Sequence, residues 1–105
     1  RIMKVVNKNL DNPELSIELI TKEVGISRAH LHRKLKELTN QNTTTFIRNI
    51  RLQQAANLLK EKRHSIVEIA RIVGFSRANN FSTAFKELYG ITPMEWREQH
   101  SNMEE

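Results

Sequence analysis

The chain has 105 residues, the size of one ordinary domain or two very small ones, and its hydrophobic content of 38% is enough for a modest core. The absence of cysteine excludes a disulfide framework, a thiolate metal site and a cysteine nucleophile. Seventeen lysines and arginines against twelve acidic residues give a net charge of +5, which favours an acidic partner such as nucleic acid or an anionic surface.

Apolar residues recur at three- and four-residue spacing almost throughout and are interrupted by only three glycines and two prolines, which predicts an all-α fold of about seven helices. The first helix covers about residues 2–10 and ends before Pro13, because proline disfavours a helical residue before it. The second helix follows the capping residue Ser16 and ends at Gly25.

The third helix begins after another capping serine, Ser27, and runs to about Asn40. Its predicted buried stripe consists of Leu31, Leu35 and Leu38. A longer central helix, from about residue 44 to residue 61, is apolar around much of its circumference. We therefore expect the central helix to be buried on several sides.

The last three helices carry clear start and stop residues. Ser65 and Glu68 form a capping box for the fifth helix, which ends at Gly74, and Ser76 is expected to cap the sixth. The predicted stripe of the sixth helix consists of Phe81, Phe85 and Leu88. The final helix starts with Thr92, Pro93 and Glu95, as cap, first-turn proline and capping-box acid, and contains Trp96 as the expected core anchor.

The sequence contains an internal repeat. Residues 16–29 align with residues 65–78 at an offset of 49, with eight identities in fourteen positions, and from residue 31 the offset becomes 50. Each copy is a short capped helix, a turn with glycine and a longer helix, which is the helix-turn-helix pattern. The repeat predicts a first helix-turn-helix subdomain (residues 1–43), a linker helix (44–62) and a second subdomain (63–105).

One such unit is as typical of a plain helical hairpin as of a DNA-binding motif, but two matched units favour DNA binding. A linker helix of about 18 residues is about 27 Å long, so it would set two outward helices near the roughly 34 Å of one duplex turn. This spacing suits two successive major grooves.

A rotation of about 100° per residue, with the leucine stripe inward, points Ala29, His32, Arg33 and Lys36 outward. Arg33 can donate two hydrogen bonds to guanine, His32 can contact a base edge or phosphate, and Ala29 can touch a thymine methyl. Lys36 suits a phosphate. The alternative is a solvated basic face, but residues 28–63 carry nine basic and two acidic groups, a net charge of +7, which favours groove contact.

The same projection of the second copy points Asn79, Ser82, Thr83 and Lys86 outward. Asn79 could pair with adenine, whereas Ser82 and Thr83 could contact bases or phosphates. Because residues 64–105 sum to a net charge of −2, we expect weaker readout here and predict that the first unit dominates affinity.

Residues at the start of each reading helix complete the expected phosphate contacts. Arg28 and Arg77 follow Ser27 and Ser76, and with the first backbone amides of the helices they could hold phosphates at the groove edges. Plain solvent exposure is the alternative for both arginines.

The residues described so far resemble the C-terminal DNA-binding domain of the AraC/XylS family of bacterial transcription regulators. The match covers nearly the whole chain and is most specific at residues 27–36, 46–52, 69–76 and 90–93, with Arg97. The resemblance implies two helix-turn-helix subdomains bridged by one long helix. It places the base-facing positions on Ala29, His32, Arg33, Asn79, Asn80, Ser82 and Thr83, of which Asn80 rests on the resemblance alone.

This sequence departs from the family pattern at three positions. Asn40 and Thr44 stand where the family usually has glycine and proline, and Thr83 stands where it often has arginine. Asparagine also adopts the left-handed conformation of a helix C-cap.

The opening segment also resembles output domains at the C-terminal end of two-component sensor-regulator hybrids. The chain begins at Arg1 in an amphipathic pattern without an initiator methionine, so we expect a piece of a longer protein. The resemblance implies that a phosphorylated receiver pairs two such domains on DNA, with dimerisation through domains missing from this chain and RNA polymerase as a further candidate partner.

Three other function classes are weighed against DNA binding. An enzyme is disfavoured because His30 and His32 lie about 200° apart on one helix and cannot share a metal, and no phosphate loop or nucleophile elbow is present. Neither a metal nor a cofactor is expected. A protein-interaction bundle with a basic face remains the alternative. A membrane role is disfavoured, since no apolar run reaches about 20 residues and the stripes are needed for the core, and a cytoplasmic location is expected.

Overall fold

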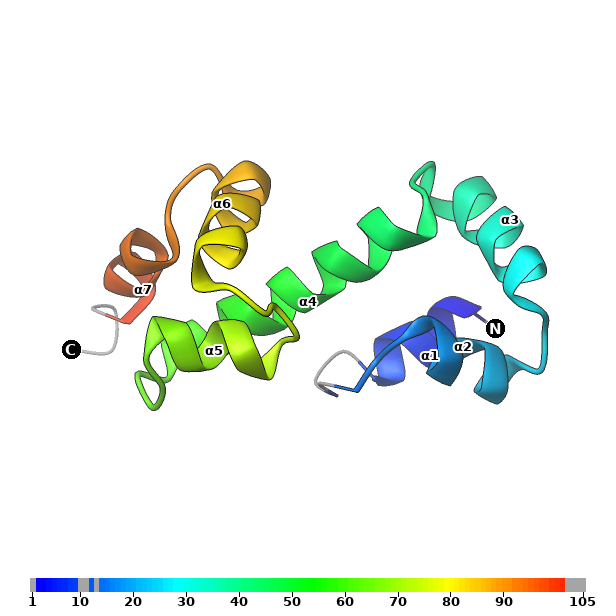
Figure 1. The fold of residues 1–105 in the computed structure, drawn as a ribbon, viewed down its shortest axis with the longest axis horizontal. Coiled ribbons are helices and arrows are strands. Elements are labelled where there is room, and N and C mark those ends of the chain that lie inside the picture. Colours follow the sequence, from blue (N-terminus) through cyan, green and yellow to red (C-terminus); the bar gives the residue numbers. More distant parts are fainter. Residues whose placement is uncertain (1, 10–11, 13, 102–105) are drawn as a thin grey trace. The chain divides into compact units, whose positions relative to one another are not determined.

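The computed structural model describes residues 2–9, 12 and 14–101, and within them the chain forms seven α-helices and no strand (Figure 1). The all-α fold predicted from the sequence is confirmed. The helices are α1 (Ile2–Lys8), α2 (Ile17–Val24), α3 (Arg28–Thr39), α4 (Thr43–Lys60), α5 (Ile66–Ile72), α6 (Ala78–Tyr89) and α7 (Pro93–Ser101). They divide into two compact units, unit 1 of residues 1–50 and unit 2 of residues 51–105, and the division falls within α4.

Unit 1 has its own hydrophobic core, built from α1, α2, α3 and the first part of α4. Ile20 of α2 and Leu31 and Leu35 of α3 are fully buried, each at 0% exposure. The buried members of this core are Ile2, Val6, Leu15, Ile20, Val24, Leu31, Leu35, Phe46, Ile47 and Ile50. Because one side of α3 is packed in this core, the opposite side of the helix faces solvent.

Unit 2 is built around an aromatic cluster. Phe85 is fully buried, and its ring centre lies 5.8 Å from that of Phe81 and 5.8 Å from that of Trp96 in an edge-on arrangement. The indole N–H of Trp96 donates a hydrogen bond to the carbonyl of Ala56 at 3.1 Å. Trp96 packs against this core while remaining partly exposed, which confirms its expected role as an anchor.

Side-chain caps set most of the helix starts. Ser16, Ser27 and Ser65 accept hydrogen bonds from backbone amides in the first turns of α2, α3 and α5, as predicted. Both predicted capping boxes are present, since Glu68 and Glu95 return hydrogen bonds to the backbone of the residues that cap their helices. The helix starts therefore follow from local sequence.

Ser76 does not cap α6, so that expectation is wrong. The N-cap of α6 is Arg77, which makes no side-chain cap hydrogen bond. The extra residue of the second copy explains the shift: Ser27 stands four residues before the buried Leu31, and Arg77 stands four residues before the buried Phe81. Because Phe81 packs in the core of unit 2, α6 begins immediately after Arg77. Ser76 therefore lies one residue too early in the chain to cap the helix.

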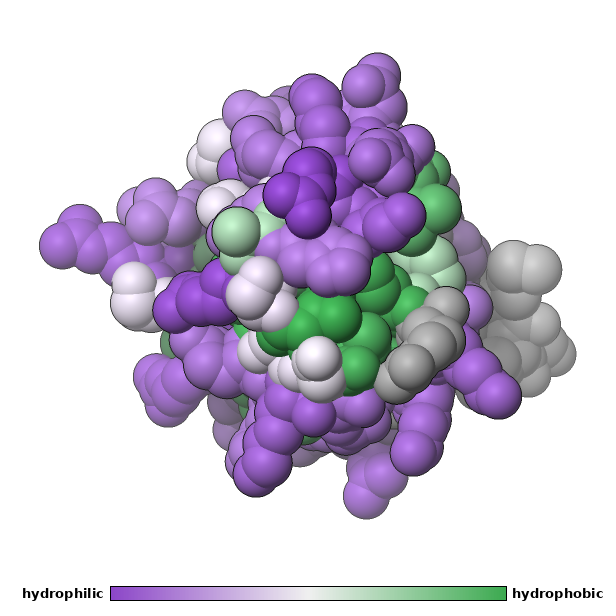
Figure 2. Space-filling model, turned by 90° about the vertical axis from the view of Figure 1, so that its right-hand side faces the viewer, coloured by the Kyte–Doolittle hydropathy of each residue, from purple (hydrophilic) through white to green (hydrophobic). Residues whose placement is uncertain are grey.

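The last apolar residue of each predicted stripe is exposed, contrary to expectation. Leu38 is 58% exposed and Leu88 is 43% exposed, and each lies one residue before the end of its helix. The last turns therefore extend beyond the packed core. Leu38 borders a hollow of about 390 Å³ in unit 1, and Figure 2 shows apolar side chains gathered on this face. The residues that line the hollow are Ile2, Val24, Ile26, His30, Lys34 and Leu38.

The helix boundaries differ slightly from the predicted ones. The central helix begins at Thr43 and ends at Lys60, one residue earlier than predicted at each end. Its start is capped by Asn42, whose Oδ1 accepts a hydrogen bond from the amide of Thr45 at 2.8 Å. The first helix ends at Lys8, and residue 10, where it was expected to end, lies outside the described residues.

The glycines of the two helix-turn-helix turns should respond similarly to alanine. Gly25 and Gly74 have φ angles of +78° and +97°, so alanine is strained at both. A Cβ at Gly25 would meet nothing within 4 Å, whereas a Cβ at Gly74 would meet only the guanidinium end of the flexible Arg51 side chain, which can move aside. We expect Gly25→Ala and Gly74→Ala each to cost about 1–2 kcal/mol, because backbone strain is the main penalty at both positions. Urea unfolding measures both, and an unchanged midpoint in either variant would contradict the left-handed backbone at that turn.

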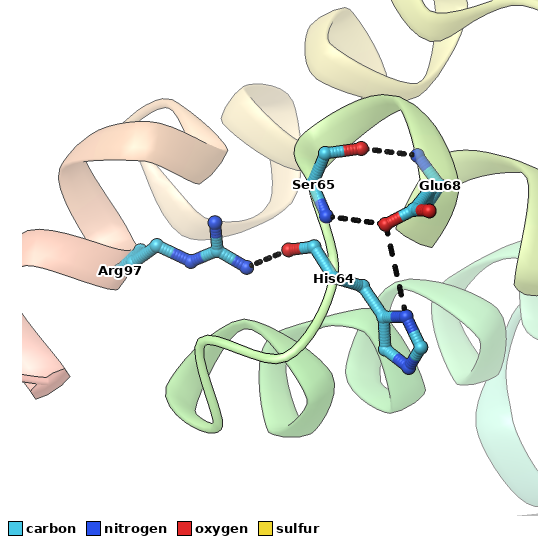
Figure 3. A network of polar contacts seen from close by, with 4 residues as sticks. All are labelled: His64, Ser65, Glu68 and Arg97. Atoms are coloured by element: carbon cyan, nitrogen blue, oxygen red, sulfur yellow. Dashed lines mark hydrogen bonds and ion pairs between the residues drawn. The ribbon is translucent and has the colours of Figure 1, made fainter.

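The two capping boxes predict a loss of stability in acid. The carboxylate of Glu68 accepts a hydrogen bond from the backbone N–H of Ser65 at 2.8 Å (Figure 3), and Glu95 accepts one from Thr92 at 2.9 Å. These hydrogen bonds hold the pKa of both carboxyl groups below the ordinary value of 4.5. A carboxyl whose pKa is lower in the folded state stabilises the fold above its unfolded pKa, and this stabilisation is lost as the pH falls through the folded pKa.

We therefore expect the urea midpoint to decrease below about pH 4.5, and to decrease less in Glu68→Gln, because glutamine does not titrate. Urea unfolding of both proteins between about pH 6 and about pH 3 tests this. A difference in stability between them that stays constant over this range would contradict the assigned cause.

Candidate nucleic-acid interface

The solvent side of α3 carries the four residues that helical projection points outward. Ala29, His32, Arg33 and Lys36 are all exposed, opposite the buried Leu31 and Leu35. Arg33 makes no hydrogen bond or ion pair with the described part of the chain. Its guanidinium can therefore donate to an external acceptor such as guanine O6 and N7 without breaking an internal contact.

Charge distinguishes α3 from α6. The α3 sequence contains four basic residues and one acidic residue, whereas α6 contains one of each. One of the α3 cations, Arg28, lies 3.6 Å from a carboxylate oxygen of Glu18, and both side chains are more than 60% exposed. Such an exposed ion pair contributes little stability, so Arg28 can exchange this partner for a phosphate.

The corresponding side of α6 is polar and nearly neutral. Asn79, Asn80 and Thr83 are exposed, and Ser82 is partly buried. The buried side of α6 consists of Phe81, Ala84 and Phe85. Asn80, which only the family resemblance nominated, is thus exposed, as Asn79 is. Asparagine amides and threonine hydroxyls can both donate and accept, so this surface can contact base edges without strong attraction to phosphate.

The first turns of α3 and α6 differ in the backbone amides that are available to bind a phosphate. Ser27 Oγ accepts from the amide of His30 at 3.1 Å, so one first-turn amide of α3 is occupied by its own cap. The start of α6 has no side-chain cap, and Ser76 and Arg77 are exposed beside it. Its first-turn amides can therefore bind phosphate oxygens together with Arg77. The last two residues expected to contact phosphate, Lys36 and Lys86, are also exposed.

One contact of a predicted reading residue was missed by sequence reasoning. His32 Nδ1 lies 2.5 Å from Oγ1 of Thr43, the first residue of α4, and Thr43 is 1% exposed. The repeat offset of 50 pairs Thr43 with Pro93, and both residues begin a helix, so Thr43 and not Thr44 occupies the family's proline position. Two features of the sequence indicate that residue 43 begins a helix: this pairing with Pro93 and the favoured capping residue Asn42 before it.

Arg97 is held inside unit 2 rather than presented to a ligand. Its Nε donates to the carbonyl of Leu59 at 3.1 Å, and its Nη2 donates to the carbonyl of His64 (Figure 3). The His64 ring in turn lies 3.8 Å from the Glu68 carboxylate. Arg97 thus satisfies carbonyl groups at and beyond the end of α4, which explains its place in the sequence motif without a role in DNA contact.

The described residues also bear on metal binding and on membrane insertion. Among these residues, no group of three or more histidine, aspartate or glutamate side chains is arranged to hold a metal ion. None of the helices described is both long enough and apolar enough to span a membrane.

Comparison with known proteins identifies relatives of this chain. A family model described as a helix-turn-helix domain matches residues 20–99. The chain is 35% identical over 98 residues to the probable transcription factor PqrA of Proteus vulgaris, covering 92% of this chain and 80% of that protein. It is 33% identical over 101 residues to histidine kinase P4 of Formosa agariphila, covering 96% of this chain and 7% of that protein.

A solved structure shows the same fold. The crystal structure of a transcriptional regulator from Chromobacterium violaceum, described as an AraC-type DNA-binding domain-containing protein, superposes with a TM-score of 0.80. Its sequence is 32% identical, and the match covers 95% of this chain and 88% of that one. The chain spans only 7% to 36% of the length of four of the curated relatives that it matches.

Proposed function

This chain belongs to the AraC/XylS family of helix-turn-helix domains, and from that premise we propose that it binds double-stranded DNA sequence-specifically and regulates transcription. The exposed basic side of α3 carries the proposal, because it combines base-reading side chains with phosphate-binding cations on one helix. The function is one of binding and not of catalysis, in agreement with the regulators among the relatives.

Exposure and side-chain chemistry support the following residue roles. The proposed base-reading residues are Ala29, His32, Arg33, Asn79, Asn80, Ser82 and Thr83. The proposed phosphate contacts are Ser27, Arg28, Lys36, Ser76, Arg77 and Lys86. The greater positive charge of α3 supports a larger contribution of unit 1 to affinity, while α6 adds discrimination through amide and hydroxyl groups.

We further propose that α3 and α6 enter successive major grooves. In functional terms the chain then divides into a first reading subdomain of residues 1–43, a linker helix of residues 44–62 and a second reading subdomain of residues 63–105. The sequence repeat supports this division, since each reading helix occupies the same place in its copy.

The role of the whole protein is a further part of the proposal. Similarity to a region of histidine kinase P4 supports an output domain in a two-component protein of the cytoplasm. In such a protein the signal would act through dimerisation by other domains, which raises the effective concentration of the second DNA-binding domain at a repeated site. RNA polymerase is the proposed partner once the operator is occupied.

A selection of bound sequences from a random duplex pool tests the proposal. We expect two short conserved blocks about one turn, or roughly 10 base pairs, apart. The selected duplex should then compete at least about a thousandfold better than random duplex of the same length. Equal competition by both duplexes would contradict base reading and would favour a basic protein-interaction bundle instead.

A further inference from the structure

A buried hydroxyl group contacts one of the proposed reading residues. Thr43 and Gln54 are the buried polar side chains in the part of the chain that the structure describes. Thr43 Oγ1 lies 2.5 Å from Nδ1 of His32, and His32 lies on the exposed side of α3. The contact links a side chain that solvent does not reach to one that faces the proposed DNA.

We propose that Thr43 is a positioning residue that fixes His32 as a hydrogen-bond donor to a base, an inference that rests on the proposed function. The His32 ring is the polar partner of the Thr43 hydroxyl among the described residues. If Nδ1 carried the proton, the hydroxyl would accept it and its own hydrogen would be buried without an acceptor, which costs free energy. The favoured arrangement has the hydroxyl donating to Nδ1, which leaves the ring proton on Nε2.

The assigned tautomer determines which base edge His32 can contact. An Nε2–H group donates, so it matches the O6 and N7 acceptors of guanine and does not match the N4 amino donor of cytosine. We therefore expect His32 to favour guanine over cytosine on the strand that it contacts. The hydroxyl of Thr43 acts through the ring and does not itself touch DNA.

The second unit has no counterpart of this threonine–histidine pair. The repeat offset of 50 pairs Thr43 with Pro93 and His32 with Ser82. Proline is well accepted at the first position of a helix, as Pro93 shows at the start of α7. A hydroxyl at residue 43 is therefore not required to begin α4. Its role is instead the hydrogen bond with the His32 ring.

The tautomer can be measured on the chain without DNA, by ¹⁵N NMR of the histidine rings in alkaline buffer. Three variants are compared: Thr43→Val and Thr43→Pro remove the hydroxyl, and Thr43→Ser keeps it. We expect an Nε2–H ring at His32 in the natural chain and in Thr43→Ser. In Thr43→Val and Thr43→Pro the Nδ1 shift should change and the Nδ1–H form should appear. An Nδ1–H ring in the natural chain, or an unchanged Nδ1 shift in both hydroxyl-free variants, would overturn the inference.

Selection from a duplex pool tests the consequence for specificity. The natural chain and Thr43→Ser should prefer guanine to cytosine about tenfold at one position, and the preference should fall to about two- to threefold in Thr43→Val and Thr43→Pro. Preferences at the other positions should stay the same. If all four proteins keep the same preference, the inference fails and the proposed function stands. If the natural chain selects no duplex, the proposed function fails, and with it the specificity role of Thr43.

Discussion

Replacing Arg33 with alanine should weaken binding to the selected duplex by about 1–3 kcal/mol, while binding to random duplex weakens much less. Arg33 is exposed on the solvent side of α3, and its guanidinium makes no hydrogen bond or ion pair with the described part of the chain. A planar guanidinium can donate two parallel hydrogen bonds to guanine O6 and N7, and no other base offers this pair of acceptors. The affinities for both duplexes are measured at one fixed salt concentration, because phosphate contacts depend on salt.

Lys34→Ala is the matched control for Arg33→Ala. Lys34 is the next residue of α3, is exposed and lies 3.5 Å from Glu37, outside the set proposed to read bases. Its removal takes away one positive charge, as the Arg33 change does, so it should weaken binding to both duplexes by similar small amounts. If Arg33→Ala also weakened both duplexes equally, Arg33 would be a phosphate contact and its base-reading role would be refuted.

Replacing Phe85 with alanine should destabilise unit 2 by about 3–5 kcal/mol, because it removes a large buried ring and leaves a cavity. Phe85 is 0% exposed and contacts the rings of Phe81, Tyr89 and Trp96. A small domain has only about 5–15 kcal/mol of stability in total, so this single change should move the unfolding midpoint of unit 2 to a much lower urea concentration. Urea unfolding followed by the fluorescence of Trp96 reports on this unit directly.

Leu88→Ala provides the control for Phe85→Ala. Sequence pattern places both residues on one stripe of α6, but Leu88 is 43% exposed in the structure. Its replacement should cost less than about 1 kcal/mol, since little apolar area returns to water. A cost for Leu88→Ala that matched the cost of Phe85→Ala would mean that the last turn of α6 is packed, in contradiction to the structure.

Local features of the chain were predictable from the sequence, because each depends on residues close together along it. The caps at Ser16, Ser27 and Ser65 need only a side-chain oxygen within three residues of an unpaired amide. The outward positions of Ala29 and Arg33 follow from the helical period once one buried side is known. The seven helices of the described residues, and the outward direction of most of the proposed reading residues, follow from such local features.

The tertiary structure decided features that depend on where a neighbouring helix lies. Leu38 lies on the same side of α3 as the buried Leu31 and Leu35, yet it is exposed because the packed core ends before the last turn of α3. Ser76 has the residue type of a cap, yet packing of Phe81 starts α6 one residue later. The contact between His32 and Thr43 joins residues eleven positions apart across a turn. Helical period determines the direction in which a side chain points, and only the packed fold determines what it meets there.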